Sequence, residues 1–313
     1  MGRVLIVGSG LMGSGIASCA ALAGNSAVLN DVDAERLEKG LASAIKCVDE
    51  LAAQGLAEPE SAAAAKGRLS TSLDLGAECG KADLVIEAIV ENLGAKQVLF
   101  EKLDALTPET VPILSNTSGL RITEIAARAK HPERTMTAHF WFPAHLVPLV
   151  EVVMSEHTDR GMAQSVKELL CGWGKAAVLV RRDTPGQLAN RVLQAVIREA
   201  TNIVDIGLAS AEDVVLAIKM GMGIRFPVWG PLEHIDAVGL DLGYSVQNTV
   251  LPEISDSKKP ADGLKAHVER GELGFKTGSG YYDWNQKSME ELAGTRNDFI
   301  VHALKFMKAR GLV

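Results

Sequence analysis

The 313-residue sequence has little cysteine, and its cysteines show neither a Cys-x-x-Cys pair nor any metal-ligand spacing. The four are Cys19, Cys47, Cys79 and Cys171. This scatter argues against a disulfide framework and predicts no metal site, so we expect four reduced core thiols in a cytoplasmic protein. No apolar run approaches the roughly 18–20 residues that span a membrane. The first residues already read as a strand, so we expect no signal peptide.

Positive charge is also in short supply. Lysine and arginine total 32 against 39 aspartates and glutamates, which gives a formal net charge of −7. This balance argues against a nucleic-acid partner or an anionic membrane surface, although a local basic site for an acidic substrate remains open. With 47% hydrophobic and 23% charged residues, the composition is that of a globular chain of about two domains.

What the chain does have is a glycine motif near its start. In "RVLIVGSGLMGSGIA", Gly8, Gly10 and Gly13 lie between a predicted buried strand and a predicted helix. Glycines at this spacing allow a tight turn, close approach of a pyrophosphate and close helix–strand packing. A second predicted strand, "SAVLND", ends at Asp31, where a carboxylate binds a ribose hydroxyl and repels a 2′-phosphate. The pattern favours NAD over NADP; the alternative is a glycine-rich turn with an incidental aspartate.

Polar residues follow two further predicted strands. Glu87, Glu91 and Lys96 cluster near the carboxyl end of the strand predicted over residues 84–89, which is where open parallel sheets bind ligands. The next strand runs into a polar elbow at residues 115–118, before a helix. These elbow residues either contribute to a site or simply cap the helix.

The segment "TAHFWFPAHLVPLVEVV" is almost wholly apolar, yet it contains His139 and Glu151. Pro143 and Pro148 interrupt it, so we predict a strand, a loop and a second strand. If the strands are neighbours, the carboxylate can orient the imidazole and make it a stronger base. The competing interpretation is a hydrogen-bonded core histidine, which is common.

Pro185 and Gly186 form a turn signal, after which the pattern becomes helical. We predict a first domain over residues 1–185 and a helical domain over residues 186–313. Asn190 lies near the start of the first helix of that second domain. Asparagine is a poor helix former, so it has either a polar task or a capping role there.

Taken together, these residues resemble the 3-hydroxyacyl-CoA dehydrogenase family over nearly the whole chain. The matching motifs, in order, are "VGSGLMGSGIA", "ADLVIEAIVENLGAKQVLFEKLD", "LSNTSGLRITEIA", "HFWFPAHLVPLVEVV", "DTPGQLANRVL", "GPLEHIDAVGLD" and "GFKTGSGYYDW". The resemblance implies an α/β fold: an N-terminal Rossmann-type, doubly wound sheet followed by an all-α C-terminal domain. It also implies NAD as cofactor, a small-molecule substrate and a homodimer.

The resemblance further implies the site. His139 would be the catalytic base and Glu151 its partner, while Ser118 and Asn190 would bind the substrate oxygen. The implied NAD contacts are Gly8, Gly10, Leu11, Met12, Gly13, Asp31, Glu91, Lys96 and Asn116. The implied reaction is reversible oxidation of a 3-hydroxyacyl-CoA to the 3-ketoacyl-CoA, in fatty acid metabolism.

Some residues depart from the family's usual motifs. Phe142 replaces the Asn of "HFFNP", Gln187 replaces the aromatic of "PGF", and Arg225 is an additional cation. Arg225 suits a free carboxylate, so a dehydrogenase of a small hydroxy carboxylate (L-gulonate-, carnitine- or aromatic-carboxylate-like) remains open. Alternatively, Arg225 forms a surface salt bridge. A third hypothesis is a structural protein that only binds the dinucleotide.

An apolar stripe follows "GYYDW" and predicts an added, docked C-terminal helix. Its members are Leu292, Phe299, Ile300, Ala303, Leu304 and Met307.

Overall fold

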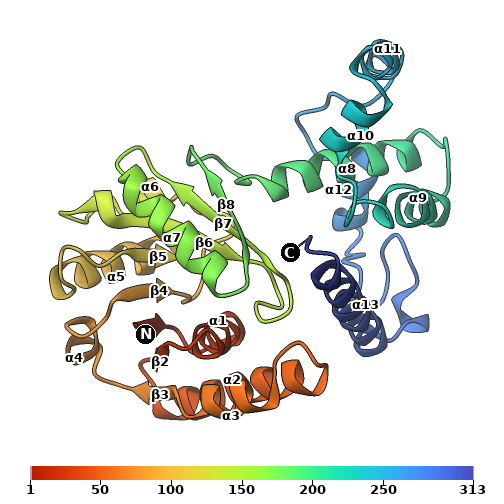
Figure 1. The fold of residues 1–313 in the computed structure, drawn as a ribbon. Coiled ribbons are helices and arrows are strands. Elements are labelled where there is room, and N and C mark those ends of the chain that lie inside the picture. Colours follow the sequence, from red (N-terminus) through yellow and green to blue (C-terminus); the bar gives the residue numbers. More distant parts are fainter. Residues whose placement is uncertain (1, 313) are drawn as a thin grey trace. The chain divides into compact units, whose positions relative to one another are not determined.

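The computed structural model describes residues 2–312, and the chain forms two compact units (Figure 1). The first unit ends at Ala189 and the second begins at Asn190. The division therefore falls within the first turn of a helix, four residues beyond the boundary predicted from the turn signal.

An eight-stranded sheet forms the centre of the first unit, in the order β3-β2-β1-β4-β5-β6-β7-β8. The strands are β1 (Arg3–Val7), β2 (Ser26–Asn30), β3 (Leu69–Ser72), β4 (Leu84–Glu87), β5 (Ile113–Ser115), β6 (Thr135–Phe140), β7 (Leu149–Met154) and β8 (Ala176–Val180). Neighbours pair in parallel, except that β6 and β7 are antiparallel. The first six follow the Rossmann order, which confirms the predicted doubly wound sheet.

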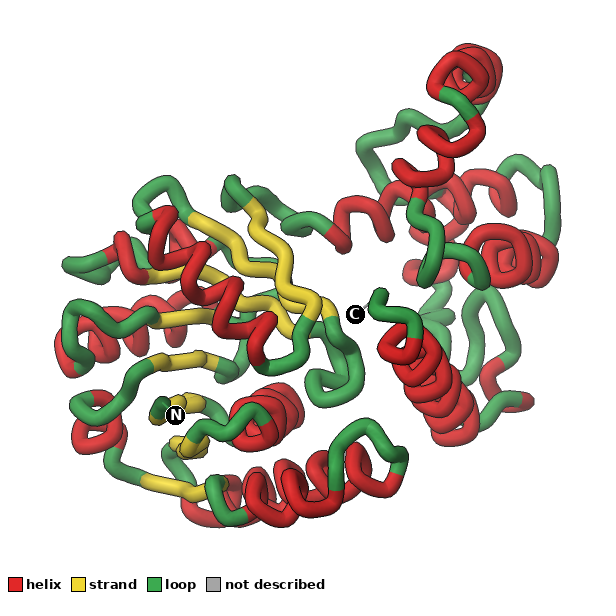
Figure 2. The backbone as a smooth tube through the Cα atoms, viewed as in Figure 1, coloured by secondary structure: helices red, strands yellow, loops and turns green. Residues whose placement is uncertain are grey.

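Helices cover both faces of this sheet, because successive strand side chains point to opposite faces. In β1, Val4 and Ile6 pack on one face with α1 (Leu11–Leu22), α2 (Ala34–Ala53), α3 (Pro59–Lys66) and α7 (Arg160–Gly172). Leu5 and Val7 pack on the other with α4 (Leu75–Cys79), α5 (Leu93–Leu106) and α6 (Ile122–Ile125). Figure 2 shows the yellow strands of this unit between red helices. Strands buried on both faces explain the continuous apolar runs in the sequence.

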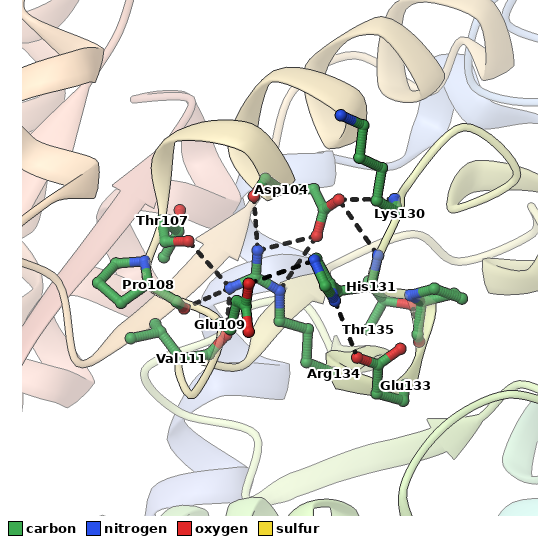
Figure 3. A network of polar contacts seen from close by, with 11 residues as sticks. Asp104, Thr107, Pro108, Glu109, Val111, Lys130, His131, Glu133, Arg134 and Thr135 are labelled. Carbon is green, nitrogen blue, oxygen red and sulfur yellow. Dashed lines mark hydrogen bonds and ion pairs between the residues drawn. The ribbon is translucent and has the colours of Figure 1, made fainter.

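A buried ion pair stabilises the end of the sheet where β5 and β6 begin (Figure 3). The Arg134 side chain is fully buried, and its Nη2 lies 2.8 Å from Asp104 Oδ1. Arg134 also donates to the carbonyl oxygens of Thr107 and Pro108, while Asp104 Oδ2 accepts from the Lys130 amide. The pair therefore joins the end of α5 to the short helix η1 (Pro132–Arg134).

The second unit is helical, and its described residues form no strand longer than an isolated bridge. Its elements are α8 (Ala189–Asp205), α9 (Ala211–Ala217), the π-turn η2 (Ile218–Gly223), α10 (Pro231–Val238), α11 (Leu240–Val250), α12 (Asp262–Glu269), the 3₁₀ turn η3 (Trp284–Gln286) and α13 (Met289–Ala309). The predicted all-α second domain is confirmed. Among its described residues, the buried hydrophobic residues are Val214 and Val301.

Two expectations about burial were wrong in part. In the added helix α13, Leu292 and Phe299 of the predicted stripe are 47% and 60% exposed, because the buried face centres on Val301. Cys171 is exposed although a core thiol was expected, since it lies on the solvent side of α7. All four cysteines are free. No helix within residues 2–312 combines the length and the apolar character of a membrane span.

Candidate active site

The strands β6 and β7 bring the imidazole and the carboxylate together. Their antiparallel register places His139 directly opposite Glu151, and His139 Nδ1 lies 2.8 Å from Glu151 Oε2. His139 is 7% exposed and Glu151 is fully buried. The two residues therefore form a buried hydrogen-bonded pair, named the dyad below.

Glu151 accepts four hydrogen bonds, two on each oxygen. His139 Nδ1 and Trp141 Nε1 lie 2.8 and 3.0 Å from Oε2. The backbone amides of Leu188 and Ala189 both donate to Oε1 over 2.9 Å. Burial alone would raise the pKa of Glu151, but these donors lower it to about 2. The carboxylate therefore stays ionised throughout the neutral pH range.

The ionised carboxylate fixes the tautomer of His139. A carboxylate can only accept hydrogen bonds, so Nδ1 must carry the proton in the 2.8 Å contact. In the neutral ring, Nε2 then has the free lone pair. An imidazole of this kind can take a proton at Nε2, and the buried negative charge of Glu151 stabilises the resulting imidazolium.

The polar elbow after β5 is held by Glu91. Its Oε1 accepts from Thr117 Oγ1 at 2.6 Å and from the amides of Ser118 and Gly119 at 3.1 Å. Burial opposes ionisation of Glu91, yet these bonds and Lys96 lower its pKa. Ser118 is exposed, so the elbow presents its hydroxyl at the carboxyl end of the sheet.

Lys96 is buried beneath this elbow at 1% exposure. Its Nζ lies 2.6 Å from Glu87 Oε1 and 3.4 Å from Glu91 Oε2, and Ser115 Oγ donates to Glu87 Oε2. Lys96 thus links the ends of β4 and β5 through two carboxylates. A direct contact of Glu91 or Lys96 with the cofactor stays a prediction.

The glycine loop has the shape that a dinucleotide phosphate needs. Gly8 has φ +105°, and a Cβ there would lie 2.6 Å from Ala88 O. A Cβ on Gly13 would lie 1.9 Å from Gly8 O, whereas one on Gly10 would meet nothing within 4 Å. The loop is therefore tightly packed at Gly8 and Gly13 and open at Gly10. At this open position, the amides at the start of α1 can bind phosphate. Leu11 is 76% exposed and Met12 half-buried in this first turn.

Asp31 lies at the end of β2, beside a cavity of about 250 Å³. Its carboxylate accepts from Ser9 N, Ser9 Oγ and Val32 N at 2.8–2.9 Å. Burial disfavours the charged form, but these bonds lower the pKa of Asp31. The cavity is lined by Val7, Gly8, Asn30, Asp31, Val32, Leu75, Ile89, Ala95, Val98, Leu99 and Lys102. An apolar cavity beside an ionised carboxylate fits the adenosine half of NAD and disfavours a 2′-phosphate.

The remaining predicted residues have the following places. Asn116 Oδ1 accepts from Phe140 N at 2.9 Å, so this side chain ties β5 to β6. Asn190 is half-buried in the first turn of α8. Arg225 is exposed, and its Nε donates to Gly221 O at 2.9 Å. The roles of these three toward cofactor or substrate stay predictions.

Two side chains at this site, Trp141 and Gln187, had not been predicted as site residues. Trp141 donates to the dyad carboxylate. Gln187 is 6% exposed with φ +49°, and its Nε2 donates to Thr117 O at 3.1 Å. The signal was present, because both positions differ from the phenylalanines of the family motifs "HFFNP" and "PGF".

Comparison with known proteins agrees with this geometry. The family description "3-hydroxyacyl-CoA dehydrogenase, NAD binding domain" matches residues 3–184, and "3-hydroxyacyl-CoA dehydrogenase, C-terminal domain" matches residues 186–284. A probable 3-hydroxybutyryl-CoA dehydrogenase of Bacillus subtilis is 39% identical over 287 residues, 91% of this chain and 98% of the relative. The chain belongs to the 3-hydroxyacyl-CoA dehydrogenase family. Like other members of this family, it is an NAD-dependent oxidoreductase that acts on CH–OH donors.

A second relative matches more of the chain. The 5-formyl-3-hydroxy-2-methylpyridine 4-carboxylate 5-dehydrogenase of Mesorhizobium japonicum is 30% identical over 308 residues, 98% of this chain and 99% of the relative. A crystal structure of an enzyme with this activity superposes with a TM-score of 0.89 at 29% identity, covering 98% of this chain and 99% of that chain. The family descriptions end at residue 284, before α13, whereas this similarity extends over nearly the whole chain.

Proposed function

We propose that this enzyme oxidises the 3-hydroxyl group of a 3-hydroxyacyl-CoA thioester, with NAD as the hydride acceptor. The observation that carries the proposal is the buried dyad, in which His139 Nδ1 meets Glu151 Oε2 at 2.8 Å. The family membership supports the thioester, since the Bacillus subtilis relative bears the name of a 3-hydroxybutyryl-CoA dehydrogenase.

The proposed reaction divides its work among a few side chains. His139 takes the hydroxyl proton at Nε2, and Glu151 stabilises the imidazolium without taking the proton itself. Ser118 and Asn190 bind the reacting oxygen and so stabilise the charge that develops on it. Bound NAD supplies the hydride-accepting ring. In the reverse direction, the His139 imidazolium returns the proton to the ketone.

A specific observation favours a second candidate substrate, a small free hydroxy carboxylate. One relative and one solved structure that match the chain over nearly its full length, α13 included, are named for a pyridine carboxylate. Arg225 is exposed and keeps donors available beside the one that binds Gly221 O. A guanidinium suits bidentate binding of a carboxylate, so we propose Arg225 as the residue that would hold such a substrate.

A substrate panel separates these candidates. NADH formation is measured with 3-hydroxybutyryl-CoA, with free 3-hydroxybutyrate, L-gulonate and carnitine, and with an aromatic hydroxymethyl carboxylate. The thioester proposal predicts that kcat/KM is highest for the CoA compound, and that Arg225→Met changes it little. Turnover of a free acid alone, lost in R225M, would replace the thioester by the carboxylate candidate. No turnover on any member would favour the structural, dinucleotide-binding hypothesis.

We also propose a homodimer formed through the second unit and a cytoplasmic location. The second unit exposes large apolar side chains in quantity, including Leu232 at 75%, Leu240 at 60% and Tyr244 at 70%. Many exposed apolar side chains of this size support burial against another chain. The four free cysteines support a reducing compartment.

A further inference from the structure

Two donors share one oxygen of the dyad. His139 Nδ1 and Trp141 Nε1 lie 2.8 and 3.0 Å from Glu151 Oε2. Trp141 directly follows the last residue of β6, two positions after His139, and alternate residues along a strand point to the same side. Their rings accordingly lie near each other, with centroids 5.6 Å apart and planes inclined by 47°. The indole and the imidazole therefore lie side by side, and both donate to the same carboxylate oxygen.

We propose that Trp141 is a positioning residue for the reaction, whose indole N–H shares the negative charge of Glu151 Oε2 and so sets the pH range in which His139 can act as base. The inference rests on the proposed role of the dyad. A phenylalanine, which the family motif "HFFNP" has here, supplies a ring of similar character but no donor. The tryptophan of this chain thus adds an interaction that the motif lacks.

The charge-sharing follows from simple electrostatics. An ionised carboxylate oxygen stabilises the imidazolium by attraction, which is strong in a buried site. A second donor on the same oxygen partly neutralises its negative charge, so the attraction between this oxygen and the His139 imidazolium is weaker. Removing the indole N–H would concentrate the charge on the histidine contact and favour the protonated ring. The base form would then be populated only at higher pH.

The charged residues that flank β8 have contacts of their own. The residues beside it in the sheet are His139 on β6 and Val178 on β8. Lys175, just before β8, donates to Ala144 O and Val147 O. Beyond β8, Asp183 accepts from Thr123 N. Within residues 2–312, the titratable group with a hydrogen bond to Glu151 is therefore His139, and the remaining donors do not titrate.

Trp141→Phe tests the proposal by two measurements. The first is the ¹⁵N chemical shift of the His139 ring, followed by NMR from pH 4 to 9 in histidine-labelled protein, which needs no turnover. The second is the pH profile of kcat/KM. We expect the titration midpoint and the acid limb of the profile to move together to higher pH by about 0.5–1 unit, a fraction of the strength of a hydrogen bond to a charge. NAD affinity and plateau kcat should change far less.

Trp173→Phe is the matched control. Trp173 Nε1 is buried and has no hydrogen-bond partner among residues 2–312, so W173F removes an indole N–H from the same unit without touching the dyad. In W173F, the midpoint of the NMR titration and the acid limb of the kcat/KM profile should both stay at their parent values. A midpoint that is unmoved in folded W141F, or moved equally in both variants, overturns the proposal. A merely structural role would lower stability or kcat without moving the midpoint.

If W141F does not fold, benzothienylalanine at position 141 replaces the N–H by sulfur and keeps the bicyclic ring. The same upward shift is expected from this analogue, and an unmoved midpoint again overturns the proposal. The proposed function fails separately, if the parent protein oxidises no hydroxy substrate. The NMR midpoint then still decides whether Trp141 acts on His139.

Discussion

At the scale of single residues, Glu151 allows the dyad to be tested without removing a ring from the site. Glu151→Gln keeps the shape of the side chain but removes the charge that stabilises the His139 imidazolium. We expect kcat to fall by at least about 100-fold, while NAD affinity, measured by fluorescence titration, stays nearly unchanged. Unchanged turnover would mean that Glu151 serves only to hold the fold.

The same carboxylate makes stability depend on pH. Its pKa is about 2 in the folded chain against an ordinary 4.5, so the unfolded chain binds the proton more readily. Its contribution, on the order of 3 kcal/mol, is fully present above about pH 4.5 and is lost as the pH falls toward 2. Urea unfolding across this window should show a shallower decline for E151Q than for the parent. Equal slopes would contradict the depressed pKa.

Asp31 tests the cofactor preference. Asp31→Ala removes the carboxylate beside the cavity and its contacts with Ser9. We expect kcat/KM for NAD to fall about 10-fold, the value of one charged hydrogen bond, while that for NADP falls less or rises. The ratio of the two constants is the measurement. An unchanged ratio would show that Asp31 does not contact the ribose.

At the scale of elements, the Arg134–Asp104 pair should matter for stability and not for chemistry. Arg134→Met leaves Asp104 buried without its partner and several carbonyls without a donor (Figure 3). We expect a loss of about 3–5 kcal/mol in the free energy of unfolding, with the pH profile of turnover unchanged. Arg128, whose exposed side chain lies 3.9 Å from Glu101, is the control. R128M should cost at most about 1 kcal/mol, and equal losses would contradict the account.

The sequence predicted helices, strands and loops best where a local pattern of residues is compatible with one structure only. The apolar runs and the glycine loop predicted the sheet, and the two prolines predicted that His139 and Glu151 lie on separate strands. The Arg134–Asp104 pair could not be predicted, because thirty residues separate two charges that no local pattern connects. The buried face predicted for α13 was wrong only in part: Leu292 and Phe299 are exposed, whereas Ile300, Ala303, Leu304 and Met307 are half-buried. A helix with apolar residues around its circumference does not specify which of them its neighbours cover.

Contacts of the site that depend on exact geometry were also beyond the sequence. In the sequence, Trp141 is one of many apolar residues in its segment. Its hydrogen bond to Glu151 can be recognised only when the register of β6 and β7 is known. Gln187 was noted as a departure, but its bond to Thr117 O needs the backbone at φ +49°.

At the scale of the whole molecule, the proposed homodimer has a direct consequence. Sedimentation equilibrium should give twice the chain mass of 33.3 kDa at micromolar concentration. Leu240→Glu, which places a charge on a side chain that is 60% exposed in the single chain, should weaken association if α11 lies in the interface. A monomer at all concentrations would leave the apolar surface of the second unit for another partner and would overturn the homodimer.

The central claim is that His139 takes the proton of a substrate hydroxyl. The most direct test is the rate of NADH formation by His139→Gln on the best substrate of the panel, beside His157→Gln, whose exposed side chain has no part in the proposed chemistry. We predict that H139Q loses turnover by at least about 1,000-fold and retains NAD binding, while H157Q behaves as the parent. Turnover retained by H139Q would contradict the account.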